Sequence, residues 1–228
     1  MATAQGRASA EIWGDRAFAT AWADGDMIAD LLALPRRIAS ALIAGDRPDS
    51  ALIVDVGSGP GAFLAEFLDH FPGARGIWTD ASAPMREKAE AELSAYGDRV
   101  SYQLLDMTEI GSGALPGGVD ILLTSRAVHH LDAAGLRAFY AAAQGLLAPG
   151  GWLVNLDHTG PGERWDERLR TARKAIVPPR PKGGGHHHDA PLTTVADHYA
   201  ALEAAGFTDF DAPWRAFHSV LFMARKDG

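Results

Sequence analysis

The 228-residue sequence contains no cysteine. Disulfide bonds, thiolate metal sites and cysteine nucleophiles are therefore excluded, and the expected compartment is the cytosol. No apolar run approaches the roughly 18 residues needed to span a bilayer, and the first residues lack the basic-then-apolar pattern of a signal peptide. We therefore expect no membrane association.

Basic residues are also scarce, because 21 Lys and Arg face 29 Asp and Glu, for a formal net charge of −8. A broad nucleic-acid surface needs clustered Lys and Arg, so we expect no nucleic-acid partner. The length and a hydrophobic content of 47% fit one globular domain with an ample core, as a monomer or a homodimer.

The most informative segment is Val54–Gly61, with the sequence VDVGSGPG. A short apolar run precedes three alternating glycines, and a helical pattern over 62–68 follows them. This order predicts a strand, a tight turn and a helix. Glycines let the backbone approach a ligand closely, and the free amides at a helix start favour polar or anionic groups.

Two kinds of nucleotide site fit these glycines. Gly57, Gly59 and Ala62 satisfy the dinucleotide pattern G-x-G-x-x-A. The segment also resembles the first motif of class I S-adenosylmethionine-dependent methyltransferases. Both families have an acid near the end of the second strand to hold ribose hydroxyls, and Asp80 lies there. The glycines and Asp80 alone leave both possibilities open.

Three further features favour the methyltransferase resemblance. Asp55, just before the turn, suits a ligand with a free ammonium group, such as the methionine part of S-adenosylmethionine. Asp106 and Met107 close a third strand, where the family commonly has an acid facing the adenine amino group. The segment SRAVHHL over 125–131 is similar to the one that follows the fourth strand in many small-molecule methyltransferases.

The resemblance implies a methyltransferase with S-adenosyl-L-methionine as its cofactor. It also implies that the cofactor-binding residues lie after the first four strands. These residues are Asp55, Gly57, Ser58, Gly59, Asp80, Ala81, Met85, Asp106, Met107, Ser125 and Arg126.

From Ala51 onward, strands and helices alternate, which is typical of an α/β protein with helices on both faces of a mostly parallel sheet. The resemblance implies seven strands that end in an antiparallel hairpin. We expect strands at 51–54, 76–79, 100–105, 119–124, 152–156, 207–210 and 219–224, helices at 62–68, 84–95, 133–147 and 193–205, and turns at 111–118 and 147–151. Asp132 should cap the helix that follows it.

The remaining segments decorate this core. Residues 9–44 predict two helices broken near 24–26, and Pro35 should bend or restart the second helix. We describe residues 1–228 as a single domain with three parts: a helical lid over 1–48, a Rossmann-like core over 51–158 and 193–226, and a basic insertion over 159–192. Helices ahead of such a core often cover the site in this family, but they could equally pad one face of the sheet.

The basic insertion predicts an anionic acceptor. Its cations are Arg164, Arg168, Arg170, Arg173, Lys174, Arg180 and Lys182, and its opposing acids are Glu163, Asp166 and Glu167. A basic segment beside the acceptor site suits a carboxylate or a phosphate, which the arginine fork binds with two hydrogen bonds. The alternative is a solvated helix face with pairs such as Asp166 and Arg170.

Histidines supply the candidate catalytic groups. His129 and His130 follow the fourth strand and His158 ends the fifth, at the edge where such sheets bind ligands. Imidazole titrates near neutral pH, so any of the three could accept a proton from a hydroxyl or amine acceptor. The alternative for the first two is an architectural role, and Asp157 could orient a base or contribute to a metal site.

The loop His186–His188 could hold a metal or touch a substrate, but zinc and iron sites usually need further ligands, so we assign no metal. The leading hypothesis is methyl transfer from S-adenosylmethionine to a small, anionic metabolite. The alternatives are metal-assisted or non-methylating chemistry on the same cofactor, and a non-catalytic cofactor-binding regulator. The acceptor atom, O, N or C, stays open.

Overall fold

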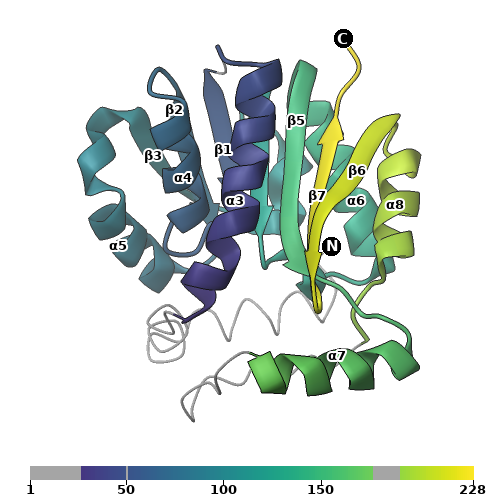
Figure 1. Ribbon diagram of the computed structural model, residues 1–228. Helices are drawn as coiled ribbons and strands as arrows, with labels where there is room; N and C mark the ends of the chain where they lie inside the picture. Colours follow the sequence, from purple (N-terminus) through teal and green to yellow (C-terminus); the bar gives the residue numbers. More distant parts are fainter. Residues whose placement is uncertain (1–26, 50, 177–190) are drawn as a thin grey trace.

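Buried strands and helices alternate along the chain, as the sequence pattern predicts (Figure 1). The computed structural model describes residues 27–49, 51–176 and 191–228, and within them seven strands form one sheet. In chain order the elements are α3 (Met27–Asp46), β1 (Leu52–Val56), α4 (Ala62–His70), β2 (Arg75–Asp80), α5 (Ala83–Glu92), η1 (Ser94–Arg99), β3 (Val100–Leu104), η2 (Met107–Ser112), β4 (Val119–Ser125), η3 (Val128–His130), α6 (Ala133–Leu146), β5 (Leu147–His158), α7 (Glu163–Ile176), α8 (Val195–Ala204), β6 (Asp209–Ala216) and β7 (Ser219–Arg225).

The strand order is β3-β2-β1-β4-β5-β7-β6. β1 pairs in parallel with β2 on one side and β4 on the other, so the winding of the chain reverses at β1. In open α/β sheets ligands bind outside the carboxyl ends of the strands at such a reversal. β7 runs antiparallel to both β5 and β6, which confirms the predicted mostly parallel sheet with a C-terminal antiparallel hairpin.

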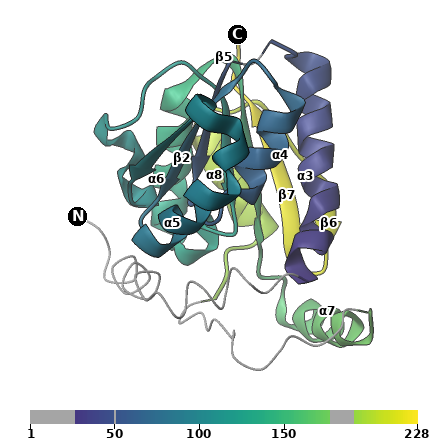
Figure 2. The same ribbon diagram turned by 90° about the vertical axis from the view of Figure 1, so that its left-hand side faces the viewer.

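Helices cover both faces of the sheet (Figures 1 and 2). α3, α4 and α5 pack on one face through side chains such as Ile43, Phe67 and Met85. α6 and α8 pack on the other face through Tyr140 and Leu202. α7 belongs to neither layer and lies across the end of the sheet where β5 finishes (Figure 1).

α3 runs through Pro35 from Met27 to Asp46, so of the two predicted outcomes, a bend or a restart of the helix, the restart is wrong. Its buried residues Leu32, Ala39 and Ile43 pack in the core, and this tertiary packing outweighs the hydrogen bond that proline cannot make. α3 contacts α4, β5 and β7, so this part of the N-terminal segment covers one face of the sheet. The first predicted helix lies outside the described residues, and a lid formed by it stays a prediction.

Other boundaries also differ. The predicted turn over 147–151 is wrong in part, because β5 begins at Leu147 directly after α6, and Leu147 pairs with Val119 ahead of a shift in register. α5 ends at Glu92, three residues early, and a 3-10 helix, η2, occupies the start of the expected turn over 111–118. The capping prediction is confirmed: Asp132 accepts a hydrogen bond from the Gly135 amide at 2.7 Å.

One carboxylate joins three elements at the opposite, amino-terminal edge of the sheet. Asp120, near the start of β4, accepts hydrogen bonds from the amides of Ala51 and Leu52 at 2.8 and 2.9 Å. Arg47, just after α3, forms an ion pair with the other oxygen. Asp120 is 9% exposed, so its removal would take the acceptor from two backbone amides and the ion-pair partner from Nη2 of Arg47.

We therefore expect Asp120→Ala to lower the free energy of unfolding by about 2–4 kcal/mol, measured by urea denaturation. Asp98→Ala is the matched control, because Asp98 is exposed, and it should change the value by less than about 0.5 kcal/mol. Equal effects of the two substitutions would show that Asp120 does not join these elements.

Candidate active site

The glycine loop between β1 and α4 has the backbone that its glycines predict. Gly57, Gly59 and Gly61 have φ angles of 64°, 55° and 90°. A Cβ on Gly57 would lie 2.6 Å from the Cβ of Ala127, so the segment after β4 excludes even an alanine there. The Trp78 indole donates a hydrogen bond to the Gly59 carbonyl at 2.8 Å, which fixes the loop against β2.

Asp55 lies beneath this loop with no exposed surface. Its Oδ2 accepts a hydrogen bond from Ser58 Oγ at 2.6 Å, but among the described residues no group donates to Oδ1 with normal hydrogen-bond geometry. Burial raises the pKa of Asp55 to about 7, although the Ser58 hydrogen bond, the positive charge of Arg36 and the nearby Leu64 amide all favour the charged form. A buried carboxylate with one unfilled oxygen suits a ligand that brings a positively charged donor.

Asp80 ends β2 and holds the same loop. Its Oδ2 accepts from the Gly59 amide at 2.9 Å and its Oδ1 from the Ser82 amide at 2.8 Å. Burial raises the pKa of Asp80, and the charge of Asp106 adds to this effect. Asp106 itself caps η2 by accepting from the Thr108 amide at 2.8 Å. The two acids predicted to face ribose and adenine thus lie at one edge of the sheet, and their roles stay predictions.

The end of β4 adds two hydroxyls and one strained residue. Thr124 Oγ1 and Ser125 Oγ are buried and have no hydrogen-bond partner among the described residues. Arg126 has a φ of 55°, in the left-handed region that non-glycine residues rarely adopt. Residues held in such conformations cluster at ligand sites, which agrees with the predicted role of Ser125 and Arg126.

The other predicted cofactor residues have different environments. Ala81 is exposed, and Met107 is half-buried at the start of η2. Met85 is 1% exposed and packs in the core on the α3 face, while its amide donates to Ser82 Oγ at 3.3 Å. Their contacts with the cofactor stay predictions.

A histidine and a carboxylate form a buried pair where β4 and β5 end. His129 Nδ1 lies 2.5 Å from Asp157 Oδ1, and the His129 amide donates to Asp157 Oδ2 at 2.9 Å. The His158 amide donates to Asp157 Oδ1 at 2.8 Å. Burial alone would raise the pKa of Asp157, but the charge and hydrogen bond of His129 outweigh it and hold this pKa well below its usual range.

The three candidate catalytic histidines lie together. The His129 ring centroid is 4.2 Å from that of His130 and 5.4 Å from that of His158. His158 Nδ1 lies 3.3 Å from Ser219 Oγ at the start of β7. Of the three rings, that of His129 lies against Asp157, and the catalytic roles of all three histidines stay predictions.

A buried polar chain lies behind this pair on the α6 and α8 face. The side-chain amide of Asn155 donates to the Tyr140 hydroxyl at 2.9 Å. This hydroxyl lies 2.7 Å from His198 Nδ1, and His198 Nε2 lies 3.1 Å from Thr193 Oγ1. Burial lowers the pKa of His198 to about 4, so it is neutral at pH 7. The chain joins β5, α6 and α8 and thereby supports the end of β5.

Two arginines of the basic segment have different partners on α7. Arg170 pairs with Asp166 at 2.7 Å one helical turn away, as the solvated-face alternative predicts. Arg168 lies over the Trp165 ring, with its guanidinium carbon 5.3 Å from the ring centroid.

Several predictions fall on residues 177–190, outside the described part of the chain. They concern Arg180, Lys182 and the His186–His188 loop. Within the described residues, no group of three or more metal-ligating side chains is arranged to hold an ion. None of the described helices is long and apolar enough to cross a membrane.

The sheet order, the glycine loop and the acids at the carboxyl ends of β1, β2 and β3 are the features of a Rossmann-like nucleotide site. Residues 54–153 match the family described as "Methyltransferase domain". This stretch is therefore a methyltransferase domain of the class I S-adenosylmethionine-dependent type. The cofactor of this family is S-adenosylmethionine, and the unfilled oxygen of Asp55 fits its ammonium group.

Known relatives agree with this family. A 3-amino-4-hydroxybenzoate 4-O-methyltransferase from Streptomyces cremeus is 36% identical over 167 residues, which are 71% of this chain and 42% of the relative. A putative O-methyltransferase structure from Nostoc punctiforme PCC 73102 has a TM-score of 0.68 at 18% identity, over 87% of this chain and 58% of that one. Human N-acetylserotonin methyltransferase, solved with S-adenosylmethionine, has a TM-score of 0.62 at 19% identity, over 88% of this chain and 54% of that one. The chain spans about half the length of these relatives.

Sequence reasoning missed Arg215 and Thr124. The sixth strand was expected to end at Phe210, but β6 runs to Ala216, so Arg215 was not placed on a strand. No local signal marked Arg215, because the end of β6 follows from its pairing with β7. Thr124 lies in an apolar run, where its hydroxyl gave no signal.

We expect Asp55→Asn to have opposite effects on stability and on cofactor binding. The pKa of Asp55 is raised from 3.8 to about 7 in the folded protein, so the free energy of unfolding should fall as the pH rises between these values. Asparagine cannot ionise, and at pH 8 the variant without cofactor should be more stable by about 2–4 kcal/mol, with a smaller difference near pH 4.

The same variant should bind S-adenosylmethionine at least about tenfold more weakly, because a neutral amide replaces the charged partner of the ammonium group. Urea denaturation at several pH values and calorimetry measure the two effects. A variant that is less stable than the parent at pH 8 would contradict the assignment of a strained, unfilled carboxylate.

Proposed function

We propose that this chain catalyses methyl transfer from S-adenosylmethionine to a hydroxyl group of a small, anionic molecule. The observation that carries the proposal is the buried pair of His129 and Asp157 at the carboxyl edge of the sheet. A hydroxyl must lose its proton as it attacks a methyl group, so this reaction gains from a base at that edge.

The pair has the features that base catalysis requires. Asp157 binds Nδ1 of His129, which leaves Nε2 as the nitrogen that accepts a proton, and the carboxylate stabilises the imidazolium that results. The hydrogen bond from the His129 amide to the same carboxylate fixes the ring relative to η3. His130 and His158 surround this ring, and we assign them positioning roles.

S-adenosylmethionine supplies a methyl group that is already activated for transfer. The residues of the chain then have two tasks, to align the acceptor and to exclude water, and alignment alone supplies several kcal/mol. We propose that Asp55, Gly57, Ser58, Gly59, Asp80, Ala81, Met85, Asp106, Met107, Ser125 and Arg126 bind the cofactor. The strongest support is the unfilled oxygen of Asp55 and the buried hydroxyl of Ser125.

Two findings support a hydroxylated, anionic acceptor. The relative from Streptomyces cremeus is named for 4-O-methylation of 3-amino-4-hydroxybenzoate, whose hydroxyl and carboxylate match the two properties. The basic helix α7 lies at the carboxyl edge, where the acceptor must approach (Figure 1). A cytosolic location and a monomeric or homodimeric state stay predictions from the sequence.

Substituting the base tests the proposal. A screen of hydroxylated aromatic compounds with labelled S-adenosylmethionine identifies an acceptor, and His129→Ala should then lower kcat by about two to four orders of magnitude. Asp157→Asn should also lower kcat, because the amide does not stabilise the charged imidazole. Cofactor affinity, measured by calorimetry, should stay within about twofold in both variants.

His130→Ala is the comparison and should lower kcat far less than His129→Ala, because the carboxylate of Asp157 lies next to the ring nitrogen of His129. Equal activity of the parent, both single variants and the double variant would show that His129 and His130 are structural. Tight cofactor binding without turnover on any acceptor would favour the regulator hypothesis instead.

A further inference from the structure

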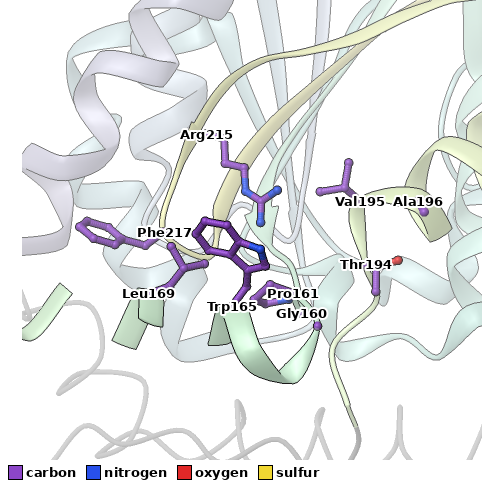
Figure 3. A pocket seen from close by; sticks show the side chains of 10 residues that line it. Gly160, Pro161, Trp165, Leu169, Thr194, Val195, Ala196, Arg215 and Phe217 are labelled. Atoms are coloured by element: carbon purple, nitrogen blue, oxygen red, sulfur yellow. The ribbon is translucent and has the colours of Figure 1, made fainter. Parts of the chain in front are cut away.

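A cavity of about 550 Å³ lies between α7, the β6–β7 hairpin and the start of α8. Figure 3 shows its lining, with Trp165 and Leu169 from α7, Arg215 and Phe217 from the hairpin, and Thr194 from the start of α8. Its volume is in the usual range for small-molecule sites. Neither the cofactor prediction nor the His129–Asp157 pair accounts for these residues.

The strand register places this cavity beside the base. Asp157 of β5 pairs with Val220 of β7, and Val220 pairs with Arg215 of β6. Directly paired residues of antiparallel strands point to the same face, so Asp157 and Arg215 lie on one face, two strands or about 10 Å apart. The cavity wall also includes Gly160, three residues beyond Asp157.

Arg215 supplies a positive charge with no partner in the described part of the chain. It makes no hydrogen bond or ion pair with any described residue, and its guanidinium points into the cavity (Figure 3). A guanidinium presents a planar fork of donors that matches one carboxylate in charge and in shape.

Two aromatic side chains line the cavity, Trp165 beside the Arg215 guanidinium and Phe217 farther away, beyond Leu169 (Figure 3). Trp165 is 59% exposed although it is large and apolar. Phe217 has a φ of 55° in the two-residue loop between the paired residues Ala216 and Ser219, a position that hairpins usually give to glycine. A bulky residue in this conformation costs backbone energy, so its ring is present for a reason other than the turn.

The wall that carries Trp165 is fixed to the hairpin. His218 Nε2, next to Phe217, lies 2.7 Å from Oδ1 of Asp166, next to Trp165. This contact links α7, which carries Trp165, to the hairpin loop that carries Phe217. Arg168, over the Trp165 ring, adds a second positive charge to the same wall.

We propose that this cavity binds the ring and the carboxylate of a planar aromatic acid, with Arg215 as the carboxylate-binding residue and Trp165 and Phe217 as the walls that contact the ring. The proposal rests on the proposed function, because the hydroxyl of the same acid would then face His129. It adds the class of the acceptor and the residues that select it.

Binding of two matched probes tests the charge recognition. 4-Hydroxybenzoate and its neutral amide, 4-hydroxybenzamide, are titrated by calorimetry into the protein saturated with S-adenosylhomocysteine. The acid should bind at least about tenfold more tightly than the amide. Arg215→Gln should weaken binding of the acid by about 10- to 100-fold and leave the amide unchanged. Arg137→Gln, an exposed arginine on α6 with the same change in net charge, should leave both unchanged.

Substitutions of the two aromatic residues should change the probe affinities in a different way. Trp165→Ala should weaken binding of the acid and of the amide equally, since it removes contact with the ring alone. Phe217→Gly should do the same without lowering the midpoint of urea unfolding, because glycine adopts a positive φ without strain. This unfolding measurement separates a lost contact from a lost fold.

Three results would overturn the proposal: no binding of either probe to the parent protein, a preference for the acid that survives Arg215→Gln, or unchanged affinities in both aromatic variants. Its failure is distinct from failure of the proposed function. If His129→Ala abolishes methyl transfer while the Arg215 variant behaves as the parent, the base assignment stands and the pocket assignment falls. If the probes bind through Arg215 but no hydroxyl is methylated, the pocket assignment stands and the proposed function falls.

Discussion

Burying a carboxylate costs several kcal/mol unless donors or positive charges surround it, and three strands of this sheet place one at their carboxyl ends. Asp157, near the end of β5, has His129 and two amides as partners. Asp80, the last residue of β2, has two loop amides. Asp55 of β1 has a hydroxyl on one oxygen and no normal hydrogen bond on the other within the described chain. Of these three carboxylates at the ligand edge, Asp55 is therefore the one whose hydrogen bonds are incomplete within the described chain.

The rest of the fold positions groups around this edge. Reversal of the winding at β1 places the glycine loop beside the segment after β4, where Ala127 leaves no room for a side chain on Gly57. The antiparallel strand β7 brings the hairpin tip to the same edge as the ends of the parallel strands. α7 then closes over that tip through His218 and Asp166 (Figure 1). The glycine loop, the His129–Asp157 pair and the hairpin tip thus have separate places along one edge.

Much of this arrangement was predictable because local signals are strong there. Glycines with positive φ and the cap at Asp132 follow directly from the sequence. The restart considered at Pro35 does not occur, since buried contacts stabilise α3 despite the missing amide hydrogen bond. Which of His129 and His130 contacts Asp157 depends on how β4 and β5 pair, and no local sequence pattern contains this information. To place Arg215 at this edge, both the length of β6 and its pairing with β7 had to be known.

Calorimetric titration of the cofactor-free protein with S-adenosylmethionine and, in parallel, with NAD tests the central claim most directly. Titration at pH 7 in two buffers of different ionisation enthalpy also counts the protons exchanged. We predict binding of S-adenosylmethionine with release of protons, because Asp55, with a pKa near 7, becomes fully charged against the ammonium group. We predict no binding of NAD. Binding of NAD in place of S-adenosylmethionine, or cofactor binding without proton release, would contradict the account.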